Sequence, residues 1–268
     1  MQDEAQTPLS TPAAGSAGFP IRDVAFDDPW EWVGAGWRDM WRVWPISLAY
    51  GAVFATVALA LLIGLFMQGG QAIIVTLAAG FLLLGPILAV GLYEASRRLL
   101  AGEPVTFIGV AFVRTASPLQ LAYLGVVLTL LFLFWVKFAM LLFALFFGQQ
   151  PFPPLTELPA TLLLTTHGIG LLVVGSAIGA GLAIAAFALS AMSVPLLMHK
   201  RTDFFTAIAT SIKALTTNPR AMLLWAALIA GLMVLGMATV FIGLIIAFPL
   251  IGHATWHAYR AVVVVEDD

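Results

Sequence analysis

Residues 45–67 read PISLAYGAVFATVALALLIGLFM, a run of 23 residues without a charged side chain. About 20 apolar residues in a helix are enough to cross the hydrocarbon core of a bilayer. Further apolar runs fill the rest of the chain, which is 61% hydrophobic and only 10% charged. Since about a quarter of the residues of a soluble domain are charged, the sequence predicts an all-α protein, a polytopic membrane helix bundle.

Polar and proline-rich breaks divide the apolar sequence into about six transmembrane helices, which we arrange as three hairpins. The third span ends near Lys137, because this residue follows Pro118 by 19 positions. That is about 28 Å of helix, so Lys137 should lie at the far interface of a core about 30 Å thick. The long run from Met222 to Val265 must contain two spans, and we place a tight turn near Gly236. The predicted spans are residues 45–67, 71–96, 118–137, 167–198, 219–236 and 239–262.

Basic residues are concentrated on one side of this arrangement. Eleven of the 12 Lys and Arg residues fall on the side of the termini, and Lys137 falls on the other. Because loops rich in Lys and Arg stay in the cytoplasm, we predict that both termini are cytoplasmic. Residues 1–28 are rich in Ala, Pro, Ser and Thr and lack an apolar core, which predicts a disordered cytoplasmic tail and not a signal peptide. A single membrane domain follows at residues 29–265.

A helix over residues 30–44 would be aromatic on one face and charged on the other. Such a helix lies in the membrane interface, with its rings at headgroup level and its charges toward water. Asp39 belongs to the charged face and is expected to point to water. Weaker copies of this element precede the third and fifth spans, which indicates a threefold repeat of an interfacial amphipathic helix followed by a hairpin. The expected interfacial anchors are Trp30, Trp37, Trp41 and Trp44.

The second helix of each predicted hairpin carries one proline, and the fourth span carries a stripe of small residues. A proline in a span either breaks the helix at a transport site or kinks it against its neighbours, and we expect kinks. Small residues four apart let another backbone approach closely. That backbone belongs either to another span of this chain, which we favour, or to a second protein. The expected kinks are Pro86, Pro195 and Pro249, and the helix-packing stripe is Gly168, Gly175, Gly179 and Ala183.

Few residues can carry chemistry. The absence of cysteine excludes disulfides, thiolate zinc sites and iron–sulfur clusters, and a net charge of −2 leaves no basic surface for nucleic acid. His253 and His257 lie one helical turn apart and are the best candidate metal ligands, and the alignment of the prolines places His199 and Glu94 at a similar depth. We weigh this site against ordinary hydrogen bonding near the interface and expect the latter. We therefore expect no catalytic residue, no cofactor and no enzyme activity.

Two stretches carry a resemblance to a known family. One reads GPILAVGLYEASRR at residues 85–98, with GEPV at 102–105, and the other reads GHATWHAYR at residues 252–260. Together they resemble the bacterial integral membrane proteins of the domain-of-unknown-function 2189 family, over nearly the whole chain after about residue 20. The resemblance implies a multi-pass protein of the bacterial inner (cytoplasmic) membrane, and it brings no established activity or catalytic residue. An automatic label on some members names subunit I of cytochrome c oxidase, which implies at most an association with a respiratory complex.

The sequence supports three functional hypotheses. The leading one is a non-catalytic accessory, assembly or scaffold protein that packs against the lipid bilayer and other integral membrane subunits. One alternative is a transporter or lipid-handling protein with a cavity between kinked hairpins, and another is a metal- or haem-binding protein that uses His253 and His257. A cavity reaching the middle of the membrane favours the lipid-handling hypothesis, and a sealed apolar bundle favours the accessory hypothesis. The oligomeric state is left open.

Overall fold

The computed structural model describes residues 18–68, 74–148, 153 and 157–265. Regular structure in these residues is helical, apart from one isolated bridge between Ile21 and Val263, so the predicted all-α class is confirmed. In chain order the helices are α1 (Asp28–Arg42), α2 (Trp44–Met67), α3 (Ile74–Leu88), α4 (Val90–Leu100), α5 (Phe107–Ala111), α6 (Pro118–Phe147), α7 (Leu158–Leu164), α8 (Thr166–Ser190), α9 (Ser193–His199), α10 (Phe204–Thr217), α11 (Pro219–Ala238) and α12 (Leu244–Val262).

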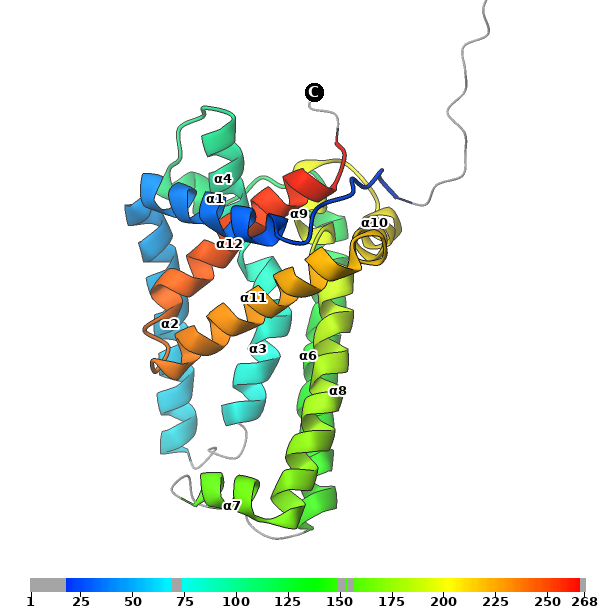
Figure 1. Ribbon diagram of the computed structural model, residues 1–268. Helices are drawn as coiled ribbons and strands as arrows, with labels where there is room; N and C mark the ends of the chain where they lie inside the picture. The colour runs from blue at the N-terminus through cyan, green and yellow to red at the C-terminus, as the bar shows by residue number, and fades with distance from the viewer. Residues whose placement is uncertain (1–17, 69–73, 149–152, 154–156, 266–268) are drawn as a thin grey trace, which may run out of the picture.

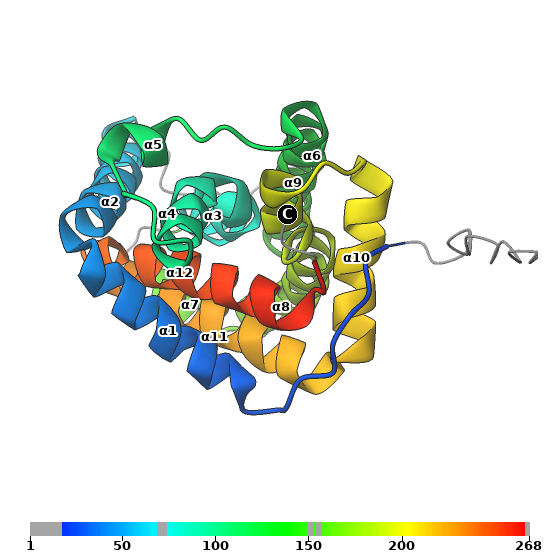
Figure 2. The same ribbon diagram turned by 90° about the horizontal axis from the view of Figure 1, so that it is seen from above.

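Four helices, α2, α3, α6 and α8, run lengthwise through the molecule, and most of the others gather at its ends (Figure 1). We call the end with α1, α4, α9 and the C-terminus the upper end, and the end with α7 the lower end. Seen from above, α1, α12 and α11 lie beside one another along one side, with α3 and α4 behind them and α10 at right angles to their ends (Figure 2). The upper end is therefore the more crowded of the two.

Four helical segments are long and apolar enough to cross a membrane: Trp44–Met67, Pro118–Phe147, Thr166–His199 and Pro219–Ala238. The prediction of six spans in three hairpins is thus not confirmed. The predicted second span divides at Ala89, three residues after Pro86, into α3 and α4. Proline lacks an N–H group and crowds the preceding turn, which favours such an interruption. α3 alone has 15 residues, only about 22 Å of helix.

The helix that contains the predicted third span does not end at Lys137. α6 continues through Lys137 to Phe147, so that it has 30 residues, about 45 Å of helix. No glycine or proline interrupts residues 138–147. The helix ends at Gly148, whose φ of +65° lies in the left-handed region that glycine favours.

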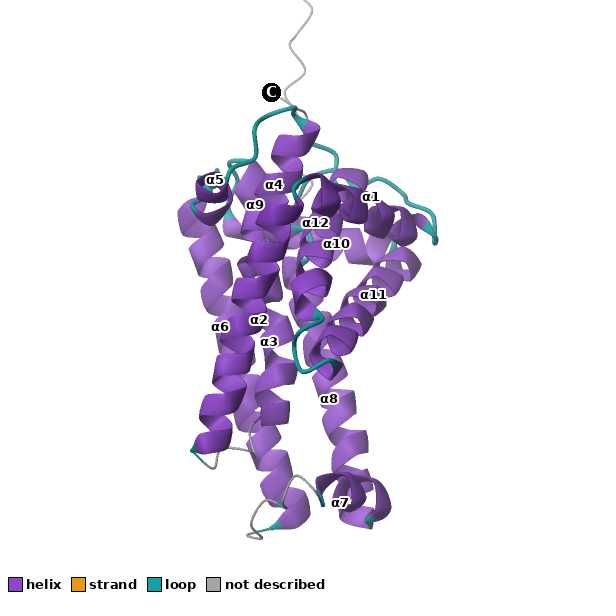
Figure 3. Ribbon diagram, turned by 90° about the vertical axis from the view of Figure 1, so that its left-hand side faces the viewer, coloured by secondary structure: helices purple, strands orange, loops and turns teal. Residues whose placement is uncertain are grey.

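The last two helices form an inclined hairpin. Its turn lies at Thr239–Gly243, later than the predicted turn near Gly236. In Figures 1 and 3 this turn stops above the lower ends of α2 and α3, so the hairpin returns to the upper end without reaching the lower one. The N–H of Phe241 donates to the carbonyl of Met237, and the N–H of Gly243 donates to the Thr239 hydroxyl. Such internal bonding is what non-helical backbone needs when it lies at membrane depth.

Part of the predicted cytoplasmic tail is ordered. Residues 1–17 lie outside the described residues, but residues 18–27 lie across the upper end (Figure 2). We call them the N-terminal strap. The N–H of Phe19 donates to Thr210 Oγ1 at 2.9 Å, and Phe19 and Val24 pack against the hydrophobic core. These apolar anchors explain why residues 18–27 have a defined place, although they were predicted to belong to the disordered tail.

α1 lies across the upper end and presents two different faces. The predicted anchors Trp30, Trp37 and Trp41 are exposed, as is Trp44 at the start of α2. The opposite face, which includes Trp32 and Met40, is buried. An interfacial helix requires this asymmetry, with rings free to reach headgroups on one side and protein on the other. The predicted second and third copies of the element correspond to α5, which has only five residues, and α10.

Candidate functional site

α12 is enclosed by its neighbours, and 14 of its 19 residues are buried. Two glycines bring neighbouring backbones close to it. A Cβ on Gly36 of α1 would lie 2.6 Å from the backbone N of Ala254, and a Cβ on Gly51 of α2 would collide with the carbonyl oxygen of Ile245. Polar side chains that face α12 from α1 and α2 are therefore sealed from solvent.

A continuous chain of hydrogen bonds lies at this contact. Ser47 Oγ is 2.8 Å from His253 Nε2, and His253 Nδ1 is 2.8 Å from Ser96 Oγ. The Ser96 hydroxyl donates to Asp39 Oδ2 at 2.8 Å, and His257 Nε2 lies 2.7 Å from the same oxygen. Since the carboxylate only accepts, Ser96 accepts from His253 Nδ1, and the neutral His253 ring accepts from Ser47 at Nε2. We call these five residues the buried polar chain; they come from α1, α2, α4 and α12.

The expectation that Asp39 faces water is wrong. Only 3% of Asp39 is exposed, and its carboxylate points to α12. Burial raises the pKa of this carboxyl, but hydrogen bonds from His257 and Ser96 lower it more, so the pKa lies below its ordinary value. Asp39 is thus the charged centre of the buried polar chain, and sequence reasoning missed it.

The four candidate metal ligands point to different neighbours. His199 Nδ1 lies 3.1 Å from the Tyr259 hydroxyl, and Glu94 is buried against Arg97 and Arg98, with nitrogen–oxygen distances of 2.7 and 2.6 Å. Both ring nitrogens of His253 are engaged by serine hydroxyls. Within the described ranges there is no group of three or more His, Asp or Glu residues that could hold a metal. Glu94, His199, His253 and His257, which were weighed as a metal site, therefore do not meet at one point.

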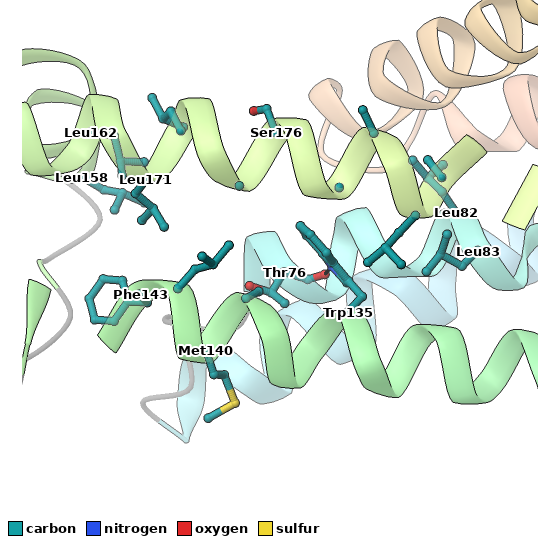
Figure 4. Close-up of a pocket in the computed structure, with 18 residues that line it drawn as sticks. Thr76, Leu82, Leu83, Trp135, Met140, Phe143, Leu158, Leu162, Leu171 and Ser176 are labelled. Atoms are coloured by element: carbon teal, nitrogen blue, oxygen red, sulfur yellow. Dashed lines mark hydrogen bonds between the residues drawn. The ribbon is translucent and has the colours of Figure 1, made fainter. Parts of the chain in front are cut away.

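A second feature lies in the lower half of the molecule. A cavity of about 610 Å³ opens between α3, α6, α7 and α8. Eight of its 18 lining residues are leucines, Trp135 and Phe143 add aromatic rings, and Figure 4 shows these side chains around the space. Trp135 Nε1 donates to the carbonyl oxygen of Thr76 at 2.8 Å, which ties α6 to the first turn of α3. No charged side chain is among the residues lining this cavity.

The predicted packing stripe faces this region. Gly175, Gly179 and Ala183 line the cavity, and a Cβ on Gly179 would lie 3.1 Å from the Trp135 ring. Gly168 sits directly against the backbone of α7. In the described part of the chain the stripe therefore contacts α6 and α7 of the same protein and borders a cavity.

The three prolines do not line the cavity. Pro195 is buried in α9 and Pro249 in α12, and α12 continues through Pro249 without a break. The interruption between α8 and α9 lies at Ala191 and Met192, before Pro195. The cavity that the lipid-handling alternative requires is present between α3, α6, α7 and α8, but none of the three prolines lines it.

Comparison with protein families gives one match. Residues 73–199 fit the model of the family described as predicted integral membrane protein (DUF2189). We call residues 73–199 the DUF2189 region. The match confirms the resemblance, but over a shorter range than expected, and the GHATWHAYR stretch lies outside it. Neither the curated proteins nor the solved structures give a match to the chain.

The DUF2189 region contains α3 to α9. Every residue that lines the cavity, from Thr76 to Ala183, lies within it. The buried polar chain, in contrast, takes only Ser96 from the DUF2189 region and its other four residues from α1, α2 and α12. The cavity is thus the feature that the DUF2189 region builds by itself.

Proposed function

We propose that this integral membrane protein handles lipids by holding a hydrocarbon chain in the cavity between α3, α6, α7 and α8. The cavity volume of about 610 Å³ lies within the range of about 300–1,000 Å³ typical of small-ligand sites. Its lining is almost entirely apolar, so the ligand must be apolar over most of its length. The observation that carries the proposal is that α6 and α8, two walls of this cavity, are candidate membrane spans of the DUF2189 region.

The opening of the cavity indicates where the ligand comes from. Met140, Ser176 and Ala180 line the cavity and are themselves exposed, so the cavity is open to the surroundings beside α6 and α8. Both helices are candidate membrane spans, and their exposed sides face hydrocarbon. A chain of a bilayer lipid can therefore enter laterally without crossing water. We expect binding without catalysis, because the lining offers no acid or base.

Two glycines of α8 provide a matched test. Gly175 lines the cavity, and a Cβ there would meet only Leu142 Cδ1, at 3.9 Å. Gly181 lies on the same helix in open space, away from the cavity. We expect Gly175→Leu to fill part of the cavity and to reduce bound lipid by about tenfold, or roughly 1.4 kcal/mol. Gly181→Leu should bind as the natural protein does.

The measurement is native mass spectrometry of the protein purified from membranes, combined with crosslinking of a lipid that carries a photoreactive group in its chain. Crosslinks are expected on α6 and α8 residues of the cavity wall. Equal lipid retention by Gly175→Leu and Gly181→Leu, or crosslinks spread evenly over the outer surface, would contradict the proposal.

An accessory or scaffold role is the second candidate. It is supported by α8, of whose 25 residues only three are buried, which leaves a wide surface for other membrane subunits. Its test is gentle purification followed by identification of co-purifying subunits, including those of respiratory complexes. A partner that stays bound to Gly175→Leu but not to a variant of the outer face of α8 would favour this role over lipid handling.

We also propose that the upper end faces the cytoplasm of a bacterial inner membrane. Eleven Lys and Arg residues belong to elements of the upper end or to the loops between them, and Lys137 of α6 is the remaining one. This asymmetry is the signature of cytoplasmic loops. Reporter fusions at Lys200 and at the C-terminus are expected to give cytoplasmic signals, and a fusion at Gly148 a periplasmic one. The reverse pattern would overturn the orientation.

A further inference from the structure

The helices around the cavity end at different levels. Trp135 of α6 donates a hydrogen bond to the carbonyl of Thr76, in the first turn of α3. These two residues therefore lie at the same level along the long axis of the molecule. From Trp135, α6 continues for 12 residues to Phe147, about 18 Å further along the helix. Figures 1 and 3 show the same difference, because α6, α7 and α8 extend below the lower ends of α2 and α3.

We place the membrane surface near the level of Trp135, on two arguments. Lys137, two residues on, is exposed on α6, and a lysine facing lipid must reach the interface with its ammonium group. Tryptophan also collects at the interface. α2 supplies an independent measure, since its 24 residues span about 36 Å, enough to cross the core and end beside the start of α3. The lower part of α6 therefore projects past this level.

The projecting part is apolar on its outside. We call residues 138–147 of α6, with α7 and the first turns of α8, the lower extension. Leu141, Leu145 and Leu164 are among its exposed residues. Each such side chain left in water forgoes roughly 1.5–3 kcal/mol of burial free energy. The exposed apolar side of α6 above it, where Leu130 lies, is on the same face of the helix, and the exposed Lys137 separates the two parts.

We propose that the lower extension draws the lipids of that leaflet beyond the surface set by α2 and α3, and that the cavity presents a lipid chain at this raised position. The inference rests on the proposed lipid binding and adds where, relative to the membrane surface, the bound chain is held. Thr76 and Trp135 line the cavity at the level of the surface, whereas Phe143 and Leu158 line it beyond. The protein is thus hydrophobic over a greater length on the side of α6 and α8 than on the side of α2 and α3. A bilayer responds to such a mismatch by thickening locally.

The cysteine-free chain allows this geometry to be tested with single substitutions. Leu130→Cys and Leu145→Cys replace exposed leucines of the same helix, and Met67→Cys replaces an exposed residue at the end of α2. The purified protein is placed in vesicles of one phospholipid and treated with a water-soluble maleimide on both sides. Leu145→Cys should react at least about tenfold more slowly than Met67→Cys, because the reactive thiolate is disfavoured in apolar surroundings.

Brominated lipids give the complementary readout. A fluorophore on Leu145→Cys should be quenched by bromines on the lipid chains nearly as well as one on Leu130→Cys. Both results should be independent of the protein-to-lipid ratio, which distinguishes lipid cover from a second copy of the chain. Reaction of Leu145→Cys as fast as Met67→Cys, or protection that disappears on dilution, would overturn the inference.

The two proposals fail in different ways. Lipid that remains bound in mass spectrometry while Leu145→Cys reacts freely would contradict the lower extension alone. Protection of Leu145→Cys together with no specific lipid on the natural protein would contradict the proposed function, and the raised chain with it.

Discussion

The two ends of the molecule differ in how their helices are packed. At the upper end 14 of the 19 residues of α12 are buried, whereas in α8, which descends to the lower end, only three of 25 are buried. The upper contacts are backbone to backbone and carry a charged hydrogen-bond chain, and the lower helices enclose a cavity. Apolar composition alone therefore does not decide packing. Glycines that allow close approach and polar groups that need partners make one end rigid and leave the other free to admit a ligand.

The largest effect is expected from removing the charge at the centre of the upper end. Asp39→Ala would leave the Ser96 hydroxyl and His257 without their common acceptor. Breaking such a buried charged contact costs roughly 3–5 kcal/mol. Glu31→Ala removes an exposed acid of the same helix and should change stability by less than about 0.5 kcal/mol. Unfolding titrations in detergent measure both, and equal stability of the two variants would show that the chain does not hold the upper end.

A smaller loss is expected when the close approach of α1 and α12 is disturbed. Gly36→Ala places a methyl group 2.6 Å from the Ala254 nitrogen, and such overpacking costs about 1–3 kcal/mol. Gly34→Ala is the matched control, because a Cβ there meets only Arg38, at 3.6 Å. It should stabilise α1 by up to about 1 kcal/mol through helix propensity. The same titrations apply, and effects of the same sign would argue against the tight contact.

Acid should weaken the upper end selectively. Because the folded pKa of Asp39 lies below its ordinary value, the ionised carboxylate adds stability above the unfolded pKa of about 3.9, and this stability is lost as pH falls through the folded pKa. Asp39→Asn lacks this titration. The stability difference between the natural protein and Asp39→Asn is therefore expected to be constant near neutral pH and to shrink below about pH 4. A difference that grows toward low pH would contradict the assignment.

The smallest effect is expected at the lower end. Trp135→Phe removes the hydrogen bond to the Thr76 carbonyl but keeps an aromatic ring beside the cavity. A loss of about 0.5–1.5 kcal/mol is expected, with lipid binding largely retained. Thermal unfolding combined with the lipid-retention assay measures both quantities. If stability falls as far as in Asp39→Ala, the contrast between a rigid upper end and a loosely packed lower end is wrong.

The sequence predicted the class of fold better than the course of its helices. Hydropathy identifies long apolar segments because every backbone group in a membrane must be bonded within a helix. It does not tell where a helix ends when the surrounding residues are all apolar, and α6 therefore ran ten residues past Lys137. Hydropathy is equally insensitive to inclination, so the α11–α12 hairpin was expected to cross and instead turns back.

The candidate sites show the same limits. Asp39 was assigned to water because the aromatic residues suggested a single membrane-facing side of α1. The spacing of Trp32, Gly36 and Met40, each four residues apart, was the available sign of a second, buried face that includes Asp39. The histidines were found, but their partners Ser47 and Ser96 lie 206 and 157 residues away. No local pattern links them. The cavity likewise depends on how α3, α6 and α8 are rotated, which hydropathy does not encode.

The N-terminal strap and α1 are the first described parts of the chain to be synthesised, and they are held by α12, which is the last. Asp39 and His257 are 218 residues apart, so at about 5–20 residues per second the ribosome needs roughly 10–40 s to deliver the partner. During this interval α1 lacks α12, the helix that covers most of its inner face, and its exposed tryptophans can hold it at the membrane surface. The upper end can therefore be completed only when translation ends. A chain that stops before α12 would leave the Asp39 carboxylate and the Trp32 side of α1 uncovered, where quality-control proteases can recognise them.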